Sequence, residues 1–345
     1  MKIAQIAPLY ESCPPKGYGG TERVVSYLTE ELVALGHDVT LFASGDSVTA
    51  ARLVAPCPRS IRLAGTGADG LAYHAIMFHE VLERIDEFDV LHFHTDYLHF
   101  PSFERDAAKT VTTMHGRLDV PMMGEILDTF AMMPLVSISN SQRLPVPGAN
   151  FVRTIYHGLP SNAGEAGNGE GGYLAFVGRI SPEKRPDRAF AIAKGAGVPL
   201  HVAAKIDPVD REYYDRKIAH LFDDPIVTFI GEIGDDKKGS FFGGARALVF
   251  PIDWPEPFGL VMIEAMAMGT PTIAFRHGSV EEIIEDGITG FVVDNVAQAI
   301  AAVAKLPQLD RAAIRRRFEE RFSIRRTAEN YVSLYRKLHL GVLAA

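Results

Sequence analysis

The start of the chain places a strand, a loop, a helix and a second strand in immediate succession. Residues 2–43 read KIAQIAPLYESCPPKGYGGTERVVSYLTEELVALGHDVTLFA. Residues 2–8 form a short apolar run, and apolar residues then recur at helical spacing. We expect Thr21 to cap this helix, Gly36 to end it, and residues 38–43 to form the next strand. This order predicts a right-handed βαβ unit.

The same alternation continues along the chain. Helices are predicted over residues 186–194 and 209–221, and strands over residues 89–93, 110–114, 134–138, 173–177, 199–204, 226–230, 247–250 and 271–275. The glycine-rich sequence SNAGEAGNGEGG at residues 161–172 interrupts the pattern and is typical of a flexible connector. The prediction is an α/β chain with two doubly wound domains, residues 1–157 and 173–324, joined by a linker over residues 158–172. We expect the active site in the cleft between the two facing sheets.

Composition narrows the class of protein. The chain has 345 residues and a net charge of −8, whereas proteins that bind mainly nucleic acid backbones are usually basic. Residues 1–150 have a net charge of −7 and residues 151–345 a net charge of −1. We therefore expect the second half to bind an anion and the first half to bind a neutral acceptor. There are two cysteines, and no apolar run reaches the ~18 residues of a membrane helix. These features predict a cytoplasmic protein without a nucleic acid partner.

Two loops contain the residue types that bind phosphate groups. Residues 17–20, GYGG, stand between a predicted strand and helix, where backbone N–H groups favour an anion. They do not form a dinucleotide fingerprint, and an ordinary turn is the alternative. Residues 178–185, GRISPEKR, follow the first strand of the second half. Here Arg179 and Lys184 are placed to neutralise a diphosphate, with an ordinary exposed loop as the alternative.

A pair of glutamates gives the strongest signal. Residues 255–271 read PEPFGLVMIEAMAMGTP, with Glu256 and Glu264 eight positions apart across a predicted loop-to-helix junction. The helix is expected to run from about Gly259 to Gly269. A carboxylate in the apolar surroundings of Glu264 is costly without hydrogen-bond donors, and sugar hydroxyls are suitable donors. The alternative is a carboxylate that nearby protein groups satisfy.

Residues 255–271 resemble the signature of retaining glycosyltransferase family 4, the group 1 glycosyltransferases similar to glycogen synthase and sucrose synthase. Residues 8–22, 113–116 and 178–184 resemble three other elements of that family and occur in the same order along the chain. The resemblance implies the GT-B fold, in which two Rossmann-like domains face each other across a cleft. It further implies that the first domain binds the acceptor and the second the nucleotide sugar, with a C-terminal helix of about residues 325–345 packing back on the first domain.

Site residues are carried over from the family position by position. By resemblance, Glu264 binds the ribose hydroxyls and Glu256 faces the donor sugar. The residues implied in catalysis are His115, Arg179, Lys184 and Glu256. Those implied in nucleotide and donor binding are Gly19, Gly20, Arg179, Lys184, Phe258, Gly259, Leu260 and Glu264. The chain departs from the family at residues 156–160, YHGLP, and at residues 251–254, PIDW, where Trp254 either contacts the ligand or anchors the loop.

The implied activity is a retaining hexosyl transfer from a nucleoside diphosphate sugar to a sugar or small-molecule acceptor, with UDP-glucose as the first choice of donor. The residues agree, because Arg179 and Lys184 can stabilise an anionic leaving group without a metal. The sequence has no Asp-x-Asp triplet, so neither a cofactor nor a divalent metal is expected. Glu256 as a covalent nucleophile is a disfavoured alternative. Two other functions stay open: a non-hydrolysing sugar-nucleotide epimerase and a nucleotide-sugar binding protein without turnover.

Two further patterns allow more than one interpretation. His92 and His94 lie on one face of a predicted strand end, and His94 with Asp96 is a candidate acceptor contact. The alternatives are a plain structural role and a zinc site, which would need more ligands. Residues 310–337 are predicted to form an arginine-rich solvated helix whose cations pair with nearby carboxylates. Its alternative is peripheral contact with an anionic membrane surface at the inner face.

Overall fold

The computed structural model describes residues 1–17, 19–63, 69–161 and 166–342. The chain forms two compact units. The first consists of Met1–Gly158 and Ile324–Ala345, and the second of Leu159–Ser323.

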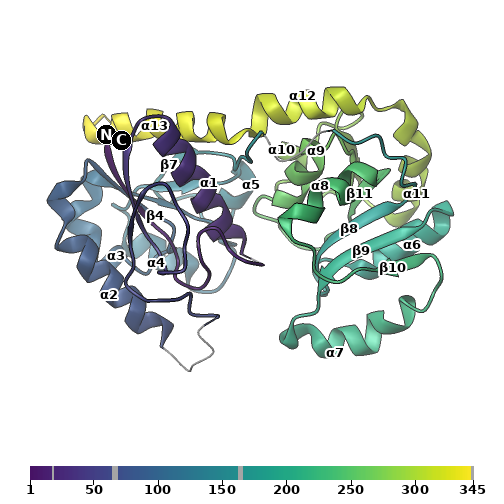
Figure 1. Ribbon diagram of the computed structural model, residues 1–345, viewed down its shortest axis with the longest axis horizontal. Helices are drawn as coiled ribbons and strands as arrows, with labels where there is room; N and C mark the ends of the chain where they lie inside the picture. The colour runs from purple at the N-terminus through teal and green to yellow at the C-terminus, as the bar shows by residue number, and fades with distance from the viewer. Residues whose placement is uncertain (18, 64–68, 162–165, 343–345) are drawn as a thin grey trace. The chain divides into compact units, whose positions relative to one another are not determined.

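The first unit contains a seven-stranded parallel sheet in the order β3-β2-β1-β4-β5-β6-β7 (Figure 1). Its strands are β1 (Lys2–Ile6), β2 (Asp38–Phe42), β3 (Arg52–Val54), β4 (Val90–Phe93), β5 (Thr110–Thr113), β6 (Leu135–Ser137) and β7 (Phe151–Thr154). The central strands match the predicted apolar runs closely. The two short edge strands, β3 and β7, were not predicted, because three or four residues give too little alternation to detect.

Helices cover both faces of this sheet. They are α1 (Gly20–Ala34), α2 (Gly70–Leu82), η1 (Ile85–Glu87), α3 (Phe100–Phe103), η2 (Glu104–Lys109), α4 (Met123–Thr129), α5 (Asn140–Arg143) and α13 (Ile324–His339). Apolar residues of α1 and α13 pack against one face of the strands, and those of α2, α3 and α4 against the other. Thr21 was predicted to cap α1, but the cap is Gly19 and the helix starts at Gly20, two residues earlier than predicted.

The second unit contains a six-stranded parallel sheet in the order β10-β9-β8-β11-β12-β13. Its strands are β8 (Leu174–Arg179), β9 (Leu200–Lys205), β10 (Val227–Phe229), β11 (Ala247–Phe250), β12 (Thr272–Phe275) and β13 (Gly290–Val293). The edge strand β13 was not predicted. In both units, parallel pairing brings the carboxyl ends of neighbouring strands to one edge of the sheet, where ligands bind in such folds.

The helices of the second unit are α6 (Pro186–Ala196), η3 (Pro208–Asp210), α7 (Arg211–Tyr213), η4 (Tyr214–Ile218), η5 (Ala219–Leu221), α8 (Asp235–Gly244), α9 (Leu260–Ala267), α10 (Val280–Ile283), α11 (Val296–Lys305), η6 (Leu306–Gln308) and α12 (Arg311–Phe322). The helix predicted over residues 209–221 is instead a series of short turns of changing pitch. Val209 is 78% exposed while Ile218 is buried, so the expected continuous apolar face is not formed.

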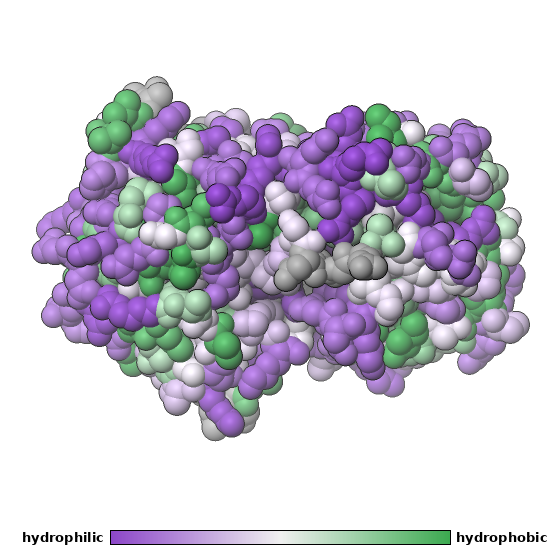
Figure 2. Space-filling view, turned by 45° about the horizontal axis from the view of Figure 1, so that its top comes forward, coloured by the Kyte–Doolittle hydropathy of each residue, from purple (hydrophilic) through white to green (hydrophobic). Residues whose placement is uncertain are grey.

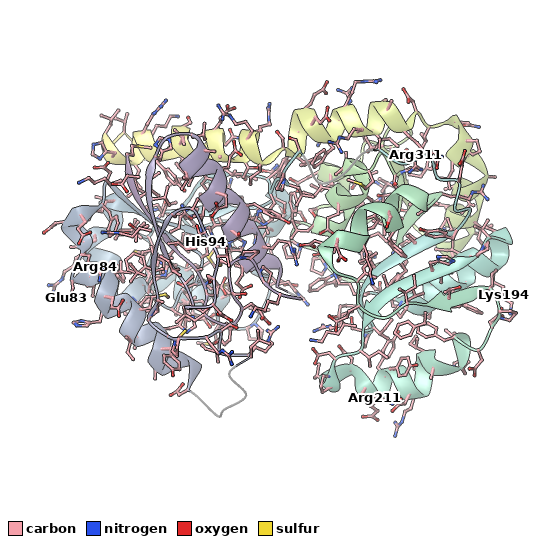
Figure 3. The ribbon with its side chains drawn as sticks, in the orientation of Figure 1. Glu83, Arg84, His94, Lys194, Arg211 and Arg311 are labelled. Atoms are coloured by element: carbon pink, nitrogen blue, oxygen red, sulfur yellow. The ribbon has the colours of Figure 1, made fainter. Side chains whose placement is uncertain are left out.

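The single helix predicted over residues 310–337 is two helices, α12 and α13, separated at Ser323, where the chain passes from the second unit to the first. Three of the predicted solvated pairs form: Arg316 with Asp310, Arg317 with Glu320, and Arg325 with Glu329. Arg315 pairs with Glu319 as predicted, but its side chain is 15% exposed and also donates to the carbonyl oxygens of Ala267 and Ser161. Arg311 likewise turns inward and donates to the carbonyl oxygens of Gly167, Gly243 and Ala245 (Figure 3).

The segment predicted as a linker, residues 158–172, lies mostly in the second unit. Its Gly167 N–H donates to the Met268 carbonyl at 3.0 Å, and Gly169 N–H donates to the Gly243 carbonyl at 2.9 Å. Residues 162–165 lie outside the described residues. Gly167 and Gly169 are therefore bonded to the body of the second unit, and their small size allows this close backbone approach.

Hydrophilic residues cover most of the face seen in Figure 2, with apolar residues in small groups among them. Among the described residues, none of the helices has the length and apolar character needed to cross a membrane.

Candidate active site

The loop that carries Glu256 lies between β11 and α9. Glu256 is 8% exposed, and its Oε2 atom accepts hydrogen bonds from Lys184 Nζ at 2.5 Å and from Trp254 Nε1 at 2.9 Å. The lysine offsets the cost of burying the carboxylate charge. Trp254 is bonded to the same oxygen, so in this structure the indole anchors the loop.

Arg179 and Lys184 come from the carboxyl end of β8 and the loop that follows it. Arg179 pairs with Glu183, and its Nε atom lies 3.0 Å from Asp210 Oδ2. Lys184 Nζ also lies 4.5 Å from the centre of the Trp254 ring. Carboxylates therefore hold both cations at the strand end, where a bound diphosphate would compete with them for the same N–H donors.

Glu264 lies on α9, and its side chain is 15% exposed. Its Oε1 atom accepts a hydrogen bond of 2.7 Å from Lys238 Nζ, which α8 supplies. Phe258, Gly259 and Leu260 lie at the start of α9, where the first N–H groups of a helix have no partner within the helix. The second unit thus places two lysine-paired carboxylates beside a helix start and a strand end that carries cations.

Sequence analysis did not assign the segment that follows β12, which fixes the Glu256 loop. Ser279 N–H donates to the Glu256 carbonyl at 3.0 Å, and Ser279 Oγ donates to the Phe258 carbonyl at 2.8 Å. The available signal was the Gly278-Ser279 pair directly after a predicted strand, since such pairs mark backbone turns and contacts.

Replacing Gly278 with alanine is expected to lower the free energy of unfolding by about 3 kcal/mol or more. Gly278 has a φ of +58°, and an added Cβ would lie 2.3 Å from both the backbone N and O of Glu256. Gly287 is the matched control, because it has a φ of +74° with open space around the added Cβ. Gly287→Ala should lower the free energy of unfolding by only about 1–2 kcal/mol, the backbone strain of a positive φ. Urea unfolding followed by Trp254 fluorescence measures both variants, and equal losses would contradict the contact with Glu256.

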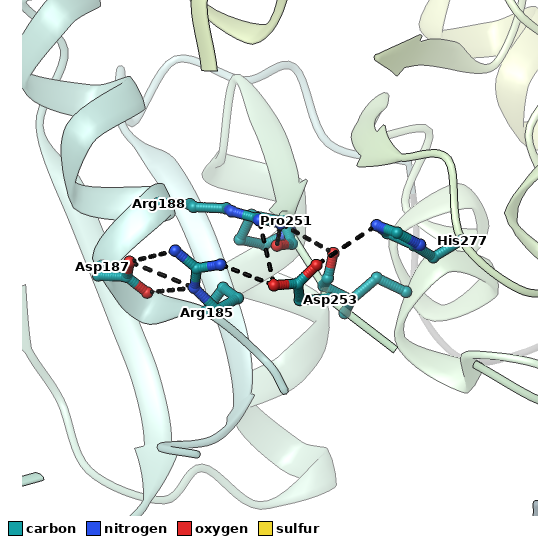
Figure 4. A network of polar contacts seen from close by, with 7 residues as sticks. Arg185, Asp187, Arg188, Pro251, Asp253 and His277 are labelled. Carbon is teal, nitrogen blue, oxygen red and sulfur yellow. Dashed lines mark hydrogen bonds and ion pairs between the residues drawn. The ribbon is translucent and has the colours of Figure 1, made fainter. Parts of the chain in front are cut away.

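Asp253 ties the start of the same loop to the start of α6 (Figure 4). Its Oδ2 atom accepts from Arg185 Nη1 at 2.8 Å and from Arg188 Nη2 at 3.1 Å, while His277 Nε2 lies 3.6 Å from Oδ1. Arg185 also pairs with Asp187. The departure from the family at residues 251–254 therefore supplies the carboxylate that anchors this loop.

In the first unit, the glycine loop leads directly into α1. Gly20 is the first residue of the helix and Gly19 precedes it, so both lie where a helix start favours an anion. A Cβ on Gly19 would lie 2.8 Å from Pro15 Cβ, so the loop requires a small residue there. Tyr18 lies outside the described residues.

A cluster of histidines lies beyond the carboxyl ends of β4 and β5. His94 Nδ1 is 2.9 Å from His115 Nε2, and His94 Nε2 is 2.8 Å from Gln5 Oε1. Figure 3 shows His94 within the first unit. The His115 ring stacks on His157, with centroids 5.2 Å apart. The structure thus brings the predicted residues His94 and His115 together and adds His157 from the YHGLP departure.

Burial keeps this cluster neutral. It lowers the pKa of His115 to about 3 and lowers the pKa values of His92, His94 and His157 well below the ordinary value, with a smaller effect from neighbouring histidines on the last three. At neutral pH these rings act as hydrogen-bonding groups without charge.

The candidate acceptor residues His94 and Asp96 are in different environments. Both ring nitrogens of His94 have partners in the first unit, so in this structure His94 orients His115, and neither nitrogen is available to an acceptor or a metal. Asp96 is exposed and has a φ of +48°, an uncommon backbone conformation for aspartate. It stays a candidate acceptor contact.

Family models match both halves of the chain. The model described as glycosyl transferases group 1 matches residues 163–321, and the model described as glycosyltransferase family 4 matches residues 18–142. The chain belongs to the group 1 glycosyltransferases. This family agrees with the resemblance carried by the paired glutamates.

Curated relatives include a D-inositol 3-phosphate glycosyltransferase of Mycolicibacterium paratuberculosis, 30% identical over 246 residues that cover 67% of this chain and 48% of the relative. A protein of the same name from Mycobacterium avium is 30% identical, covering 67% of this chain and 50% of the relative. The chain spans about half the length of the curated relatives it matches.

Solved structures share the GT-B fold of this chain. AviGT4, described as a glycosyltransferase of avilamycin A biosynthesis, is 23% identical with a TM-score of 0.77, covering 99% of this chain and 98% of that one. Sucrose-phosphate synthase from Thermosynechococcus elongatus is 18% identical with a TM-score of 0.78, covering 99% of each chain. HepE from Anabaena, in complex with UDP and glucose, is 16% identical with a TM-score of 0.72, covering 97% and 99%.

Proposed function

We propose that the chain transfers a hexosyl group from a nucleoside diphosphate sugar, with UDP-glucose as the first choice, to a sugar or small-molecule acceptor. The second unit binds the donor, and the first unit supplies the acceptor contacts and His115. Anomeric configuration is retained and no divalent metal takes part.

The ion pair between Lys184 and Glu256, with Nζ and Oε2 2.5 Å apart, carries this proposal. It joins a cation suited to a phosphate and a carboxylate suited to sugar hydroxyls in one contact. Arg179 adds a second cation at the strand end, and Glu264 adds a second carboxylate on α9 for the ribose. Diphosphate, sugar and ribose contacts thus come from neighbouring segments of one sheet edge.

The reaction follows from the charges. The bond between the anomeric carbon and the donor phosphate oxygen breaks, and the acceptor oxygen bonds to that carbon on the same face. The acceptor proton passes to the leaving phosphate, while Arg179 and Lys184 stabilise its negative charge. Glu256 is a poor covalent nucleophile, because Lys184 and Trp254 both donate to its Oε2 atom.

Two structures of one other protein, HepE, support the choice of donor. HepE has been solved with UDP and glucose and with UDP-glucose, and it shares the fold of this chain over nearly its full length. Two measurements test the remaining parts of the proposal. Activity in excess chelator tests the absence of a divalent metal, and NMR of the product tests the retention of anomeric configuration. Lost activity in chelator, or an inverted product, would overturn the corresponding part.

Replacing Glu264 with alanine is expected to weaken nucleotide binding about ten- to a hundredfold. The carboxylate would lose hydrogen bonds to the ribose hydroxyls, each worth ~1.5–3 kcal/mol when one partner is charged. Calorimetric titration of the full chain with UDP, GDP and ADP measures the effect and identifies the preferred base.

Glu320→Ala is the matched control for this variant. Glu320 lies on α12 in the same unit, pairs with Arg317 and is 58% exposed, so its removal changes the net charge equally. Its affinity for the nucleotide should equal that of the wild type. Unchanged affinity in Glu264→Ala would refute the ribose contact.

A further inference from the structure

A lysine at the carboxyl end of β9 lies beside the arginine that ends β8. In the parallel pairing of these two strands, Lys205 is opposite Arg179. Opposite residues of neighbouring parallel strands lie about 5 Å apart, and their side chains point to the same face of the sheet. Lys205 therefore adds a cation to the sheet edge that carries Arg179 and Lys184, and sequence analysis did not assign it a role.

Helix α8 covers the face of the sheet on which Arg179 and Lys205 lie. Tyr173 and His201 belong to the same face, because they precede these two residues by an even number of positions and strand side chains alternate between faces. Their rings stack with centroids 3.8 Å apart, and the Tyr173 hydroxyl donates to the Phe241 carbonyl of α8 at 2.6 Å. The alternate residues of β8 and β9 pack with α6 on the other face. Lys205 thus lies on the α8 side of the sheet.

The order of the strands sets the direction in which a nucleotide sugar lies along this edge. Glu256 follows β11, Arg179 ends β8 and Lys205 ends β9, and the three strands are adjacent in this order. A donor with its sugar at Glu256 and its diphosphate at Arg179 therefore extends its nucleoside toward β9. The ribose contact agrees with this direction, because Lys238 of α8 holds the Glu264 carboxylate, with Nζ and Oε1 2.7 Å apart. The base of the nucleotide then comes to the strand end that carries Lys205.

The Lys205 ammonium makes a loose ion pair within its own loop. The Lys205 side chain is 28% exposed, and its Nζ atom lies 3.7 Å from Asp207 Oδ2, which is longer than a hydrogen bond. The other oxygen of Asp207 accepts from the Val209 N–H at 3.3 Å. A ligand oxygen can therefore approach Lys205 Nζ without displacing a hydrogen bond from Asp207.

We propose that Lys205 selects the base of the nucleotide by donating a hydrogen bond to a carbonyl oxygen on its ring, so that the site takes uracil or guanine and rejects cytosine and adenine. An ammonium group can only donate hydrogen bonds. Uracil and guanine present a carbonyl oxygen where cytosine and adenine carry an amino group, which is itself a donor. The proposal rests on the proposed function, since it requires that the second unit binds a nucleotide.

Calorimetric titration of the full chain with UDP and CDP tests this role, because the two nucleotides differ only along one edge of the base. We expect the wild type to bind UDP at least tenfold more tightly than CDP. Lys205→Met keeps the aliphatic stem and should weaken UDP binding about ten- to a hundredfold, while CDP binding stays within about twofold of the wild type. Equal affinities of the wild type for UDP and CDP, or equal losses for both in Lys205→Met, would overturn the proposal.

Lys237→Met is the matched control. Lys237 is an exposed lysine of α8 in the same unit, so its removal changes the net charge equally, and both affinities should match the wild type. If GDP binds more tightly than UDP, the comparison uses GDP and ADP, which also differ by a carbonyl oxygen and an amino group. Failure of the proposed function has a different signature, because none of the four nucleotides would then bind to the wild type.

Discussion

Lowering the pH from 7 to 5 is expected to destabilise the first unit far more than the second. Burial lowers the pKa of several histidines of the first unit, and it does so most strongly for five of them: His92, His94, His99, His115 and His157. The folded unit leaves them neutral, while the unfolded chain binds protons below pH ~6.5, so stability is lost as the pH falls through that value. Each ring that stays neutral in the folded unit at pH 5 lowers the free energy of unfolding by about 2 kcal/mol relative to pH 7. Together these losses approach the ~5–15 kcal/mol that stabilises a whole domain.

Urea titrations at pH 7 and pH 5 measure this effect, with pulsed hydrogen exchange and mass spectrometry reporting β4 and β5 separately from β8 and β11. Trp254, the only tryptophan, reports the second unit by fluorescence. His99→Gln should reduce the difference between the two pH values by about 2 kcal/mol, because it removes one titrating ring. If the urea concentration at which β4 and β5 are half unfolded were the same at pH 7 and pH 5, the assignment of five neutral buried histidines would be contradicted.

Arg179→Ala is expected to lower kcat with UDP-glucose about 10²- to 10³-fold. The variant removes a cation from the leaving phosphate. It also leaves Glu183 and Asp210 without their guanidinium partner, so two carboxylates then face the site where negative charge develops. The effect should fall mainly on kcat, since the charge on the leaving group is greatest in the transition state.

Lys194→Ala is the matched control for Arg179→Ala. Lys194 lies on α6 in the same unit, is 62% exposed and pairs with Asp224, and its position is shown in Figure 3. Its removal changes the net charge by the same amount and should leave kcat at the wild-type value. Initial rates of nucleoside diphosphate release compare the two variants, and activity near the wild type in Arg179→Ala would exclude its role on the diphosphate.

The sequence predicted the sheets well because buried parallel strands are continuous apolar runs between helical segments. The central strands β1, β4, β8 and β11 were all located in this way. The short edge strands β3, β7 and β13 were missed because they bury little surface. Helical periodicity over residues 310–337 did not show the break at Ser323 between α12 and α13, where the chain changes from one unit to the other; only the family resemblance implied a separate C-terminal helix from about residue 325.

The sequence predicted some residues of the candidate site and did not predict the residues that pair with them. Glu256, Glu264, Arg179 and Lys184 lie in loops whose residue types and spacing point to their chemistry. Their partners could not be predicted, because Lys184 and Glu256 are separated by 72 positions.

The most direct test of the central claim is the release of free nucleoside diphosphate when the full chain is incubated with a panel of sugar nucleotides and simple sugar acceptors. We predict that UDP is released from UDP-glucose, with the hexose recovered on an acceptor. An intact nucleotide with a changed sugar would identify an epimerase instead. Binding without release from any donor would contradict the account and leave a nucleotide-sugar binding protein.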